Sequence, residues 1–332
     1  MRAIVLVSGG LDSILAAKII KDQGIDIVPL NFKTPFYHIN PHSYNGSDLA
    51  EFTRNTLGEE LRVEDIDKDF VELLLNPRYG FGAHMNPCID CKILMLLKSK
   101  ELMQEFNAKF IVTGEVLGQR PMSQYRQALK RIEEDAGLKG LLLRPLSAKN
   151  LIPTIPEVEG WIDRDKLFNI SGRSRRLQID LAKRLGIFGY PNASGGCLLT
   201  DRQFSERLKD LIRHREPSLR NIELLKVGRH FRLGEHTKLI VGRNEKENNY
   251  LEERAAAGDY LFVTEENVAG PVCLGVGDFS EEQIMLSGRI ACRYYDLREN
   301  GAKVSCRLVF DKKSLSLSVT PLGEDDLAVL RL

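Results

Sequence analysis

The residues best suited to bind a charged ligand are two serines, two glycines and an acid in the segment SGGLDS, residues 8–13. An apolar run over 3–8 precedes this turn and an amphipathic pattern over 11–23 follows it, which predicts a strand, a tight turn and a helix. Glycines let a backbone approach an anion closely, and the helix N-terminus adds partial positive charge. The turn predicts a phosphate site made by Ser8, Gly9, Gly10 and Ser13.

Asp12 lies inside this turn, where a carboxylate repels a phosphate. A divalent cation between the carboxylate and the phosphates, such as Mg²⁺, removes the conflict. The turn lacks the lysine and the spacing of a Walker P-loop, and it lacks the G-x-G-x-x-G pattern of dinucleotide-binding folds. The alternative interpretation is an ordinary helix start, with Asp12 and Ser13 as N-terminal residues.

Three of the six cysteines form a second chemical group. Cys88 and Cys91 form a C-x-x-C pair at an expected helix start after Pro87, where the helix dipole and Lys92 favour thiolates. Cys197 follows a Gly-Gly turn far along the chain. Because open α/β sheets place ligands at their carboxyl edge, we expect the three thiols to meet near the phosphate turn.

Several chemistries remain open for these thiols. Three thiolates can hold a [4Fe–4S] cluster with one iron left open for sulfide. Two thiols can instead carry and resolve a persulfide, and a zinc site is possible if His84 is the fourth ligand. Buried, unreactive thiols are the remaining interpretation. The other cysteines lie in apolar, strand-like runs and are expected in a core: Cys273, Cys292 and Cys306.

The elements that must position these groups alternate between strand and helix. Strands are expected at 3–8, 25–32 and 108–115, and helices at 11–23, 52–61 and 93–106. Such alternation predicts an α/β fold with a parallel sheet and crossover helices. The composition changes after about residue 200, where a charged helical stretch is followed by short strands with glycine turns. We expect a first domain over 1–205, a charged helical linker over 206–228 and a smaller α+β domain over 229–332.

The chain has 332 residues, of which 43% are hydrophobic and 28% charged, and its net charge is +1. A balanced charge provides no global attraction for nucleic acid, so any RNA binding must rest on local patches. The N-terminal apolar run is too short for a signal-peptide core and no segment reads as a membrane span. We therefore expect a cytoplasmic protein that does not contact a membrane.

The segment SGGLDS resembles the PP-loop of the ATP pyrophosphatase superfamily, which has an adenine nucleotide alpha hydrolase-like fold. Members cleave ATP between its α- and β-phosphates and adenylate a carbonyl oxygen. The resemblance implies that Ser8, Gly9, Gly10, Asp12 and Ser13 bind ATP.

Residues 1–200 resemble the tRNA-thiolating members of this superfamily. Cys91 and Cys197 match the two catalytic cysteines of bacterial tRNA-specific 2-thiouridylases, whereas Cys88 stands where that family has an acid. A C-x-x-C pair with one distant cysteine is instead similar to iron–sulfur-dependent thiolases, which implies that Cys88, Cys91 and Cys197 hold a cluster.

The segment IVTGEVLGQRPMSQ, residues 111–124, is similar to a motif of 4-thiouridine synthetases. It implies nucleotide contacts for Gly114 and Glu115, and site contacts toward RNA for Gln119 and Ser123.

Residues 228–275 resemble the RNA-binding domain of NFACT proteins, through Val-Gly-Arg-Asn and a later Gly-Asp before an aromatic. Local donors and basic clusters extend the expected RNA surface, although turn residues and a solvated helix face explain the same pattern. The expected contacts are Arg173, Arg175, Arg176, Lys238, Arg243 and Asn244.

Together these features predict an ATP-dependent tRNA uridine sulfurtransferase that uses Mg²⁺ and a [4Fe–4S] cluster, with Asp12, Cys91 and Cys197 as catalytic residues. Its expected partners are tRNA and a sulfur donor, which is either sulfide or a cysteine desulfurase or carrier, and a homodimer is possible. The sequence leaves open which tRNA position is modified (8, 34 or 54) and whether the product is a 2-thio or a 4-thio uridine. One alternative is a PP-loop enzyme that adenylates a small molecule for attack by ammonia or another nucleophile. The other is an RNA-binding adaptor that senses a nucleotide.

Overall fold

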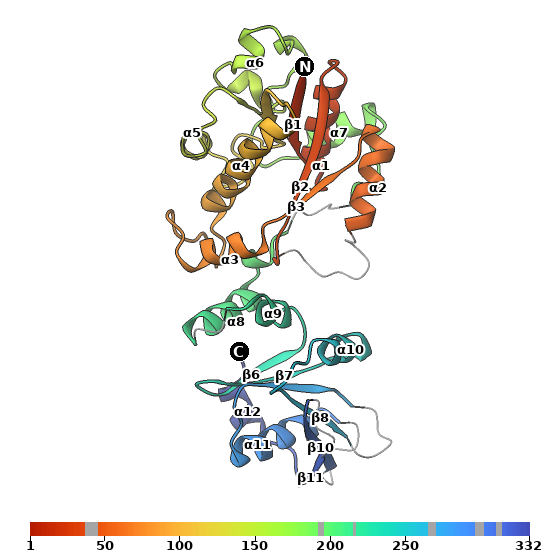
Figure 1. Cartoon of the computed structure of the whole chain (residues 1–332), viewed down its shortest axis with the longest axis vertical. Helices are drawn as coiled ribbons and strands as arrows, with labels where there is room; N and C mark the ends of the chain where they lie inside the picture. Colours follow the sequence, from red (N-terminus) through yellow and green to blue (C-terminus); the bar gives the residue numbers. More distant parts are fainter. Residues whose placement is uncertain (37–45, 192–195, 215–216, 265–269, 296–301, 310–313) are drawn as a thin grey trace. The chain divides into compact units, whose positions relative to one another are not determined.

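The computed structural model describes residues 1–36, 46–191, 196–214, 217–264, 270–295, 302–309 and 314–332 (Figure 1). The chain divides into two compact units, Met1–Thr200 and Asp201–Leu332. The charged stretch expected as a linker is grouped with the second unit and forms helices α8 (Arg202–Arg213) and α9 (Leu219–Leu224).

A parallel sheet forms the centre of the first unit, which confirms the expected α/β class. Its described strands lie in the order β3-β2-β1-β4-β5 and every described pair is parallel. The strands are β1 (Arg2–Leu6), β2 (Asp26–Lys33), β3 (Arg62–Asp65), β4 (Phe110–Val112) and β5 (Leu142–Leu143). Both faces are covered by helices, which is why the central strands read as nearly continuous apolar runs.

Helices flank this sheet on both sides (Figure 1). One side carries α1 (Leu11–Lys21), α2 (Gly46–Leu57) and α7 (Arg176–Arg184), and the other carries α4 (Cys88–Glu105) and α5 (Arg126–Asp135). The remaining helical segments of the unit are α3 (Asp67–Leu75), α6 (Ile155–Val158) and three 3₁₀ turns at Ala148–Asn150, Arg164–Lys166 and Leu198–Thr200.

The strand order reverses direction at β1. From β1 the chain moves outward through β2 and β3, and then returns to the other side of β1 to form β4. In open α/β sheets such a reversal leaves a crevice beyond the carboxyl ends of the two central strands, and ligands bind there. The turn after β1 and the segment after β4 both end at this crevice.

The second unit is built on an antiparallel sheet, as expected for an α+β domain. Its described strands have the order β11-β10-β8-β9-β7-β6. They are β6 (Arg229–Gly234), β7 (Thr237–Val241), β8 (Tyr260–Thr264), β9 (Cys273–Val276), β10 (Ala302–Leu308) and β11 (Ser314–Val319).

Successive residues of these strands point to opposite faces, and each face has its own core. Leu239 and Phe262 pack in one cluster with α11 (Glu281–Cys292) and α12 (Glu324–Leu330). Ile240 and Leu261 pack in the other, which includes Leu251 of α10 (Glu245–Glu253) and Leu224 of α9. Cys273, Cys292 and Cys306 are buried in the first cluster, which confirms that they are core thiols.

Candidate active site at the carboxyl edge of the parallel sheet

The turn after β1 presents the N-terminus of α1 to the crevice. Gly9 has φ +77°, a left-handed conformation that glycine adopts at no steric cost. The hydroxyl of Ser13 donates to the Gly10 carbonyl (2.8 Å) and accepts from the Ser8 backbone N–H (3.2 Å), which closes the turn. Gly10 is the N-cap residue and has no side chain to cap the helix. The Ser13 N–H donates to the Gly10 carbonyl at 3.2 Å, so an anion can be bound by the N–H groups of Leu11 and Asp12.

Gly114 lets the segment after β4 lie directly against this turn. A Cβ atom at Gly114 would be 2.5 Å from the Asp12 carbonyl carbon and 2.5 Å from the Ser13 backbone nitrogen. Real Cβ atoms do not approach backbone this closely, so glycine is required by space here. The expected nucleotide segments at 8–13 and 114–115 therefore form one surface.

A pocket at this edge collects groups from several segments of the first unit. Besides the turn after β1 and the end of β4, its lining includes the end of β2, the start of α4 and the segment at 196–199. The residues expected from the sequence that line it are Ser8, Gly10, Asp12, Ser13, Cys88, Cys91, Gly114, Glu115, Ser123 and Cys197. The structure thus brings the phosphate turn and all three expected thiols to one place.

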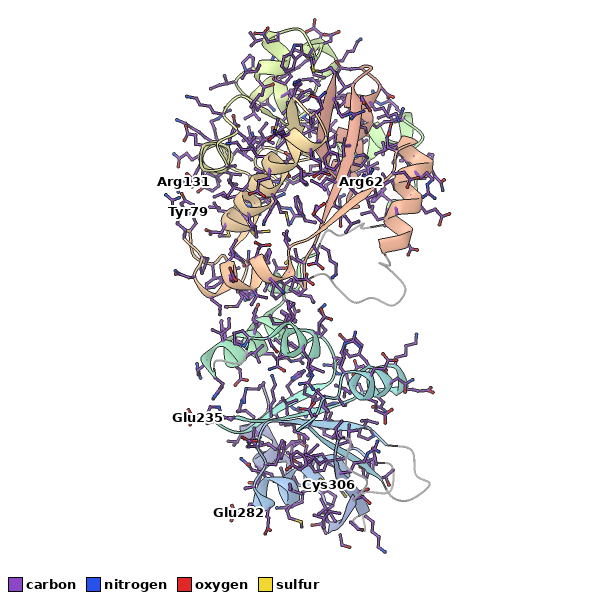
Figure 2. The ribbon with its side chains drawn as sticks, viewed as in Figure 1. Arg62, Tyr79, Arg131, Glu235, Glu282 and Cys306 are labelled. Atoms are coloured by element: carbon purple, nitrogen blue, oxygen red, sulfur yellow. The ribbon has the colours of Figure 1, made fainter. Side chains whose placement is uncertain are left out.

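The loop before Cys88 is held by α4 and α5. Asp90 is buried and accepts hydrogen bonds from the backbone N–H groups of Arg78 (3.0 Å) and Tyr79 (3.1 Å). The Tyr79 hydroxyl donates to Asp135, and the guanidinium of Arg131 lies 5.1 Å from the Tyr79 ring centre (Figure 2). These contacts fix the position at which α4 begins, and therefore the positions of its two cysteines.

The thiols do not have the charge state expected from a helix start. Burial raises the pKa of Cys91, and the positive charge of Lys92 offsets this only in part. Burial also raises the pKa of Cys197, to about 11. The structure therefore does not favour the expected thiolate at Cys91, because desolvation of a sulfur anion outweighs the one neighbouring cation. The Cys88 sulfur accepts a hydrogen bond from the Asn86 side-chain amide at 3.3 Å.

The expected cluster and zinc sites remain predictions, because the cysteines share a pocket without being arranged as a metal site. Within the described ranges, no three histidine, cysteine, aspartate or glutamate side chains are grouped closely enough to hold a metal ion. His84, the expected fourth zinc ligand, is included in that statement. Three thiols nevertheless line one pocket, which is the donor set that a cluster with an open iron takes. Their side chains must reorient to bind it.

Asp12 is held at one oxygen and unpaired at the other. Its Oδ2 accepts a hydrogen bond from the Gln119 amide (2.7 Å), while Oδ1 is buried and has no hydrogen-bond partner among the described residues. Burial raises the pKa of Asp12, opposed by the Gln119 hydrogen bond, by the charges of Arg175 and Arg120, and least by the nearby Gln178 amide. An unpaired buried carboxylate oxygen is the kind of ligand that Mg²⁺ takes, so Asp12 fits the expected ion.

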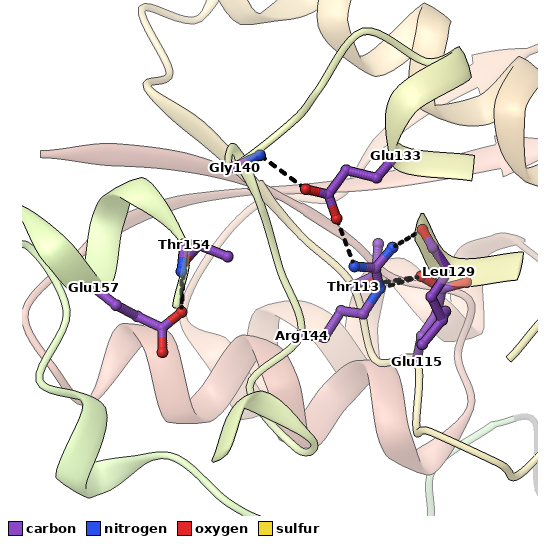
Figure 3. A network of polar contacts seen from close by, with 8 residues as sticks. All are labelled: Thr113, Glu115, Leu129, Glu133, Gly140, Arg144, Thr154 and Glu157. Atoms are coloured by element: carbon purple, nitrogen blue, oxygen red, sulfur yellow. Dashed lines mark hydrogen bonds and ion pairs between the residues drawn. The ribbon is translucent and has the colours of Figure 1, made fainter. Parts of the chain in front are cut away.

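Glu115 belongs to a buried ionic network (Figure 3). Its Oε2 accepts from the guanidinium of Arg144 and from the Thr113 hydroxyl, both at 3.1 Å, and the ammonium of Lys92 lies 3.9 Å from Oε1. Arg144 also donates to Glu133 at 3.0 Å. Burial favours the neutral acid, but Lys92 and Arg144 outweigh it, so the pKa of Glu115 is lowered.

The expected role of Glu115 is a nucleotide contact, but in the structure its carboxylate is engaged by neighbouring side chains. Its carboxylate is directed at Arg144, Thr113 and Lys92, and its place in the pocket wall lets it orient Lys92 beside Cys91. Arg144, the ion-pair partner of Glu115, was not expected from the sequence. Its signal was an arginine inside the apolar run GLLLRPL, where a charge needs a buried partner.

The residues expected to bind RNA in the first unit fall into two groups. Arg173 and Arg176 are exposed at the start of α7 and stay candidates for phosphate contacts. Arg175 is half-buried and its charge acts on Asp12, while Gln119 binds Asp12 directly. Ser123 is 2% exposed and lines the pocket. Three of the five therefore belong to the pocket region rather than to an outer RNA surface.

Of the three residues expected to contact RNA in the second unit, two are engaged in contacts within the fold. Lys238 is 4% exposed and its ammonium lies 3.9 Å from Asp210, so it does not face a phosphate in solvent. The side chain of Asn244 caps α10 by accepting from the Glu247 backbone N–H at 3.0 Å. Arg243 donates to the Gly228 carbonyl at 2.8 Å and keeps part of its side chain exposed. Lys238 and Asn244 are thus engaged in contacts within the second unit, and Arg243 is the one of the three with an exposed side chain.

Two family models match separate parts of the chain. Residues 1–153 match the family described as thiamine biosynthesis protein (ThiI), and residues 228–330 match the NFACT protein RNA binding domain. They confirm the resemblance expected from the sequence, a PP-loop thiolation segment followed by an NFACT-type segment.

Among the individual relatives is the tRNA-specific 2-thiouridylase MnmA of Petrotoga mobilis, 22% identical over 63% of this chain and 58% of its own length. The enzyme of the same name from Proteus mirabilis is 22% identical over 99% of this chain and 89% of its own length. A solved 4-thiouridine synthetase–RNA complex with bound ATP is 21% identical, covers 67% of this chain and 52% of its own, and has a TM-score of 0.39. The family and sequence comparisons agree with the class expected from the sequence, a tRNA-thiolating enzyme.

No helix in the described part of the chain is long and apolar enough to cross a membrane.

Proposed function

We propose that this protein is an ATP-dependent tRNA uridine sulfurtransferase acting in the cytoplasm. The observation that carries the proposal is the pocket in which a phosphate-binding turn, an unpaired aspartate oxygen and three cysteines meet. A nucleotide site and a sulfur site must adjoin if one enzyme activates a carbonyl and then replaces its oxygen. The 2-thiouridylase relatives and the ThiI family match support the same activity.

The first half of the reaction is adenylation of a uridine carbonyl oxygen. The N–H groups at the start of α1 bind the phosphates, and Asp12 would hold a Mg²⁺ ion, which when bound neutralises their charge. The uridine oxygen attacks the α-phosphorus, the bond to the β-phosphate oxygen breaks, and pyrophosphate leaves. Lys92 and Arg120 line the pocket, where positive charge stabilises the negative charge that develops on the phosphates.

The second half replaces the activated oxygen with sulfur. A sulfide sulfur attacks the adenylated carbon, the carbon–oxygen bond breaks, and AMP leaves with the oxygen. Cys88, Cys91 and Cys197 would hold a [4Fe–4S] cluster, which when bound supplies an open iron for sulfide. In the competing route, the outer sulfur of a Cys197 persulfide attacks the adenylated carbon and AMP leaves. The Cys91 thiol then attacks the Cys197 sulfur, which releases the thiolated uridine and forms a disulfide that an external thiol reduces. Sulfide is the donor for the cluster route, whereas the persulfide route takes sulfane sulfur from a cysteine desulfurase or carrier.

Substrate binding is assigned to surfaces outside the pocket. Arg173 and Arg176 contact tRNA phosphates in the first unit, and the NFACT-type segment supplies further RNA contacts in the second. Because the net charge is only +1, the protein as a whole does not attract RNA, and binding must rest on these local patches. We expect salt to weaken tRNA binding by screening the charges of these patches.

The test is mass spectrometry of nucleosides from total tRNA in a deletion strain. The strain is complemented with the wild type, with Cys197→Ala, or with Cys306→Ala as a core-thiol control. Loss of one thiolated uridine, restored by the wild type and the control but not by Cys197→Ala, supports the proposal and names the product. An unchanged thionucleoside profile in the deletion strain contradicts it and favours adenylation of a small molecule.

The cluster has its own test. Iron and acid-labile sulfide are measured in anaerobically purified wild type and in Cys88→Ala, Cys91→Ala and Cys197→Ala. Iron and sulfide in the wild type, reduced in all three variants, support the cluster. Background levels in the wild type contradict it and favour the persulfide route.

A further inference from the structure

Helix α7 carries a buried amide where a leucine is expected. Its buried residues are Gln178, Leu181 and Ala182, spaced i, i+3 and i+4, and the latter two belong to the apolar core that includes much of α1. Gln178 is 0% exposed. Burying an amide without full hydrogen bonding is destabilising, so a glutamine in such a stripe needs a compensating role.

Gln178 begins a chain of hydrogen bonds that ends at the phosphate turn. Its Nε2 donates to Oε1 of Gln119 at 2.9 Å, and Nε2 of Gln119 donates to Oδ2 of Asp12 at 2.7 Å. The direction of the chain is forced by chemistry. An ionised carboxylate only accepts, so Gln119 must turn its NH₂ group to Asp12 and its oxygen to Gln178, which must then donate.

The chain fixes which oxygen of Asp12 remains available. Oδ2 is occupied by Gln119, whereas Oδ1 is buried without a hydrogen-bond partner in the described part of the chain. Asp12 lines the pocket, and the positive charges of Arg175 and Arg120 act on it. The Gln178 Oε1 atom is also buried without a partner among described residues. A buried oxygen without a partner calls for one, and at Asp12, which lines the pocket, a cation can supply it.

We infer that Gln119 and Gln178 are positioning residues that hold Asp12 so that its Oδ1 receives the Mg²⁺ ion of the bound nucleotide. The inference rests on the proposed use of ATP and adds the residues that set the metal site. Neither glutamine touches the reacting atoms. Removing an outer partner of a metal-binding side chain typically lowers metal affinity about 10–100-fold.

The experiment measures binding of a non-hydrolysable ATP analogue to the full chain by calorimetry, at a series of Mg²⁺ concentrations and in EDTA. Gln178→Leu is compared with the wild type and with Gln127→Leu, which replaces an exposed glutamine of α5. We expect Gln178→Leu to raise the Mg²⁺ concentration needed for half-maximal binding about 10-fold or more. Binding in EDTA and the melting temperature should not fall, because leucine extends the apolar stripe and removes an unpaired oxygen.

A second variant covers the case in which Gln178→Leu does not fold. Gln119→Met breaks the same chain at its half-buried end and should raise the Mg²⁺ requirement to a similar extent. Gln178→Glu should do the same, because its carboxylate draws the Gln119 NH₂ group away from Asp12.

The outcomes separate the two ideas. Mg²⁺-dependent binding in the wild type with an unchanged Mg²⁺ requirement in the folded variants overturns the positioning role and leaves the proposed function intact. Absence of nucleotide binding by the wild type at every Mg²⁺ concentration overturns ATP use and the positioning role together.

Discussion

Replacing Gly114 with alanine adds a single methyl group where the segment after β4 meets the phosphate turn. The added Cβ would lie 2.5 Å from the Asp12 carbonyl carbon, 2.5 Å from the Ser13 nitrogen and 2.6 Å from the Asp12 carbonyl oxygen. All three atoms belong to the backbone of the turn or the first turn of α1. No flexible side chain can move aside, so one of the two segments must shift.

The size of that shift sets the expected effect. Ordinary contacts begin near 3.4 Å, so the segments must separate by nearly 1 Å. A displacement of about 1 Å between catalytic groups typically costs about 100-fold in rate. Forcing an extra methyl group into a packed site typically costs about 1–3 kcal/mol of unfolding free energy. For a unit of this size, that lowers the melting temperature by about 2–12 °C.

The assay is ATP-dependent thiolation of unmodified tRNA by purified protein, with pyrophosphate release and the melting temperature measured in parallel. Gly323→Ala is the matched control, because Gly323 has an ordinary φ of −60° and its nearest non-neighbouring atom would be 3.6 Å from a Cβ. We expect Gly114→Ala to lose about 100-fold in both activities. Wild-type activity and melting temperature in Gly114→Ala would show that the two segments do not meet as described.

Three further predictions follow from buried charges and exposed arginines. Arg144→Met leaves Glu115 buried without its main partner and should lower the unfolding free energy measured in urea by about 3–5 kcal/mol. Combining it with Glu115→Gln should recover much of that stability, and equal stability of the single and double variants contradicts the pairing. Burial, with the charges of Lys238 and Arg207, holds the pKa of His230 well below 6.5. The contribution of the neutral imidazole to the unfolding free energy of the second unit is therefore fully present above pH 6.5, and it falls by at most about 1.4 kcal/mol per pH unit as the pH drops below that value. His230→Asn should lack this pH dependence in urea titrations, and a pH profile identical to that of the wild type refutes the prediction. The double variant Arg173→Ala, Arg176→Ala should weaken tRNA binding and reduce the slope of log affinity against log salt by about 2. The control, Arg62→Ala, replaces an exposed arginine of β3 that is labelled in Figure 2 and should change neither quantity. An unchanged slope in the double variant would show that Arg173 and Arg176 do not contact RNA.

Much of the first unit was predictable because its signals are local. The strand, glycine turn and helix over residues 3–23 follow from apolar periodicity and from turn residues, and the structure has β1, the turn and α1 there. The alternation of strands and helices predicted a parallel sheet, and a parallel sheet predicts that its carboxyl edge collects the ligands. The meeting of Cys88, Cys91 and Cys197 in one pocket is a consequence of that topology.

Less predictable were side chains whose environment depends on distant segments. Lys238 and Asn244 are polar residues near a turn, and only the packed structure shows one buried near Asp210 and the other capping α10. The expected thiolate at Cys91 is not favoured for the same reason. Local sequence shows a helix start and a lysine, but the pKa also depends on how completely the sulfur is removed from water.

The strand, glycine turn and helix around Asp12 could be predicted from residues within one short segment, and the α/β class from the alternation of such segments. Which side chains pair with one another became visible only in the folded chain. Gln119 lies 107 residues from Asp12 and 59 from Gln178, and Arg144 lies 29 from Glu115. Hydrogen bonds and ion pairs across such separations leave no periodic pattern in the chain, because a single side chain at each end is enough to form them.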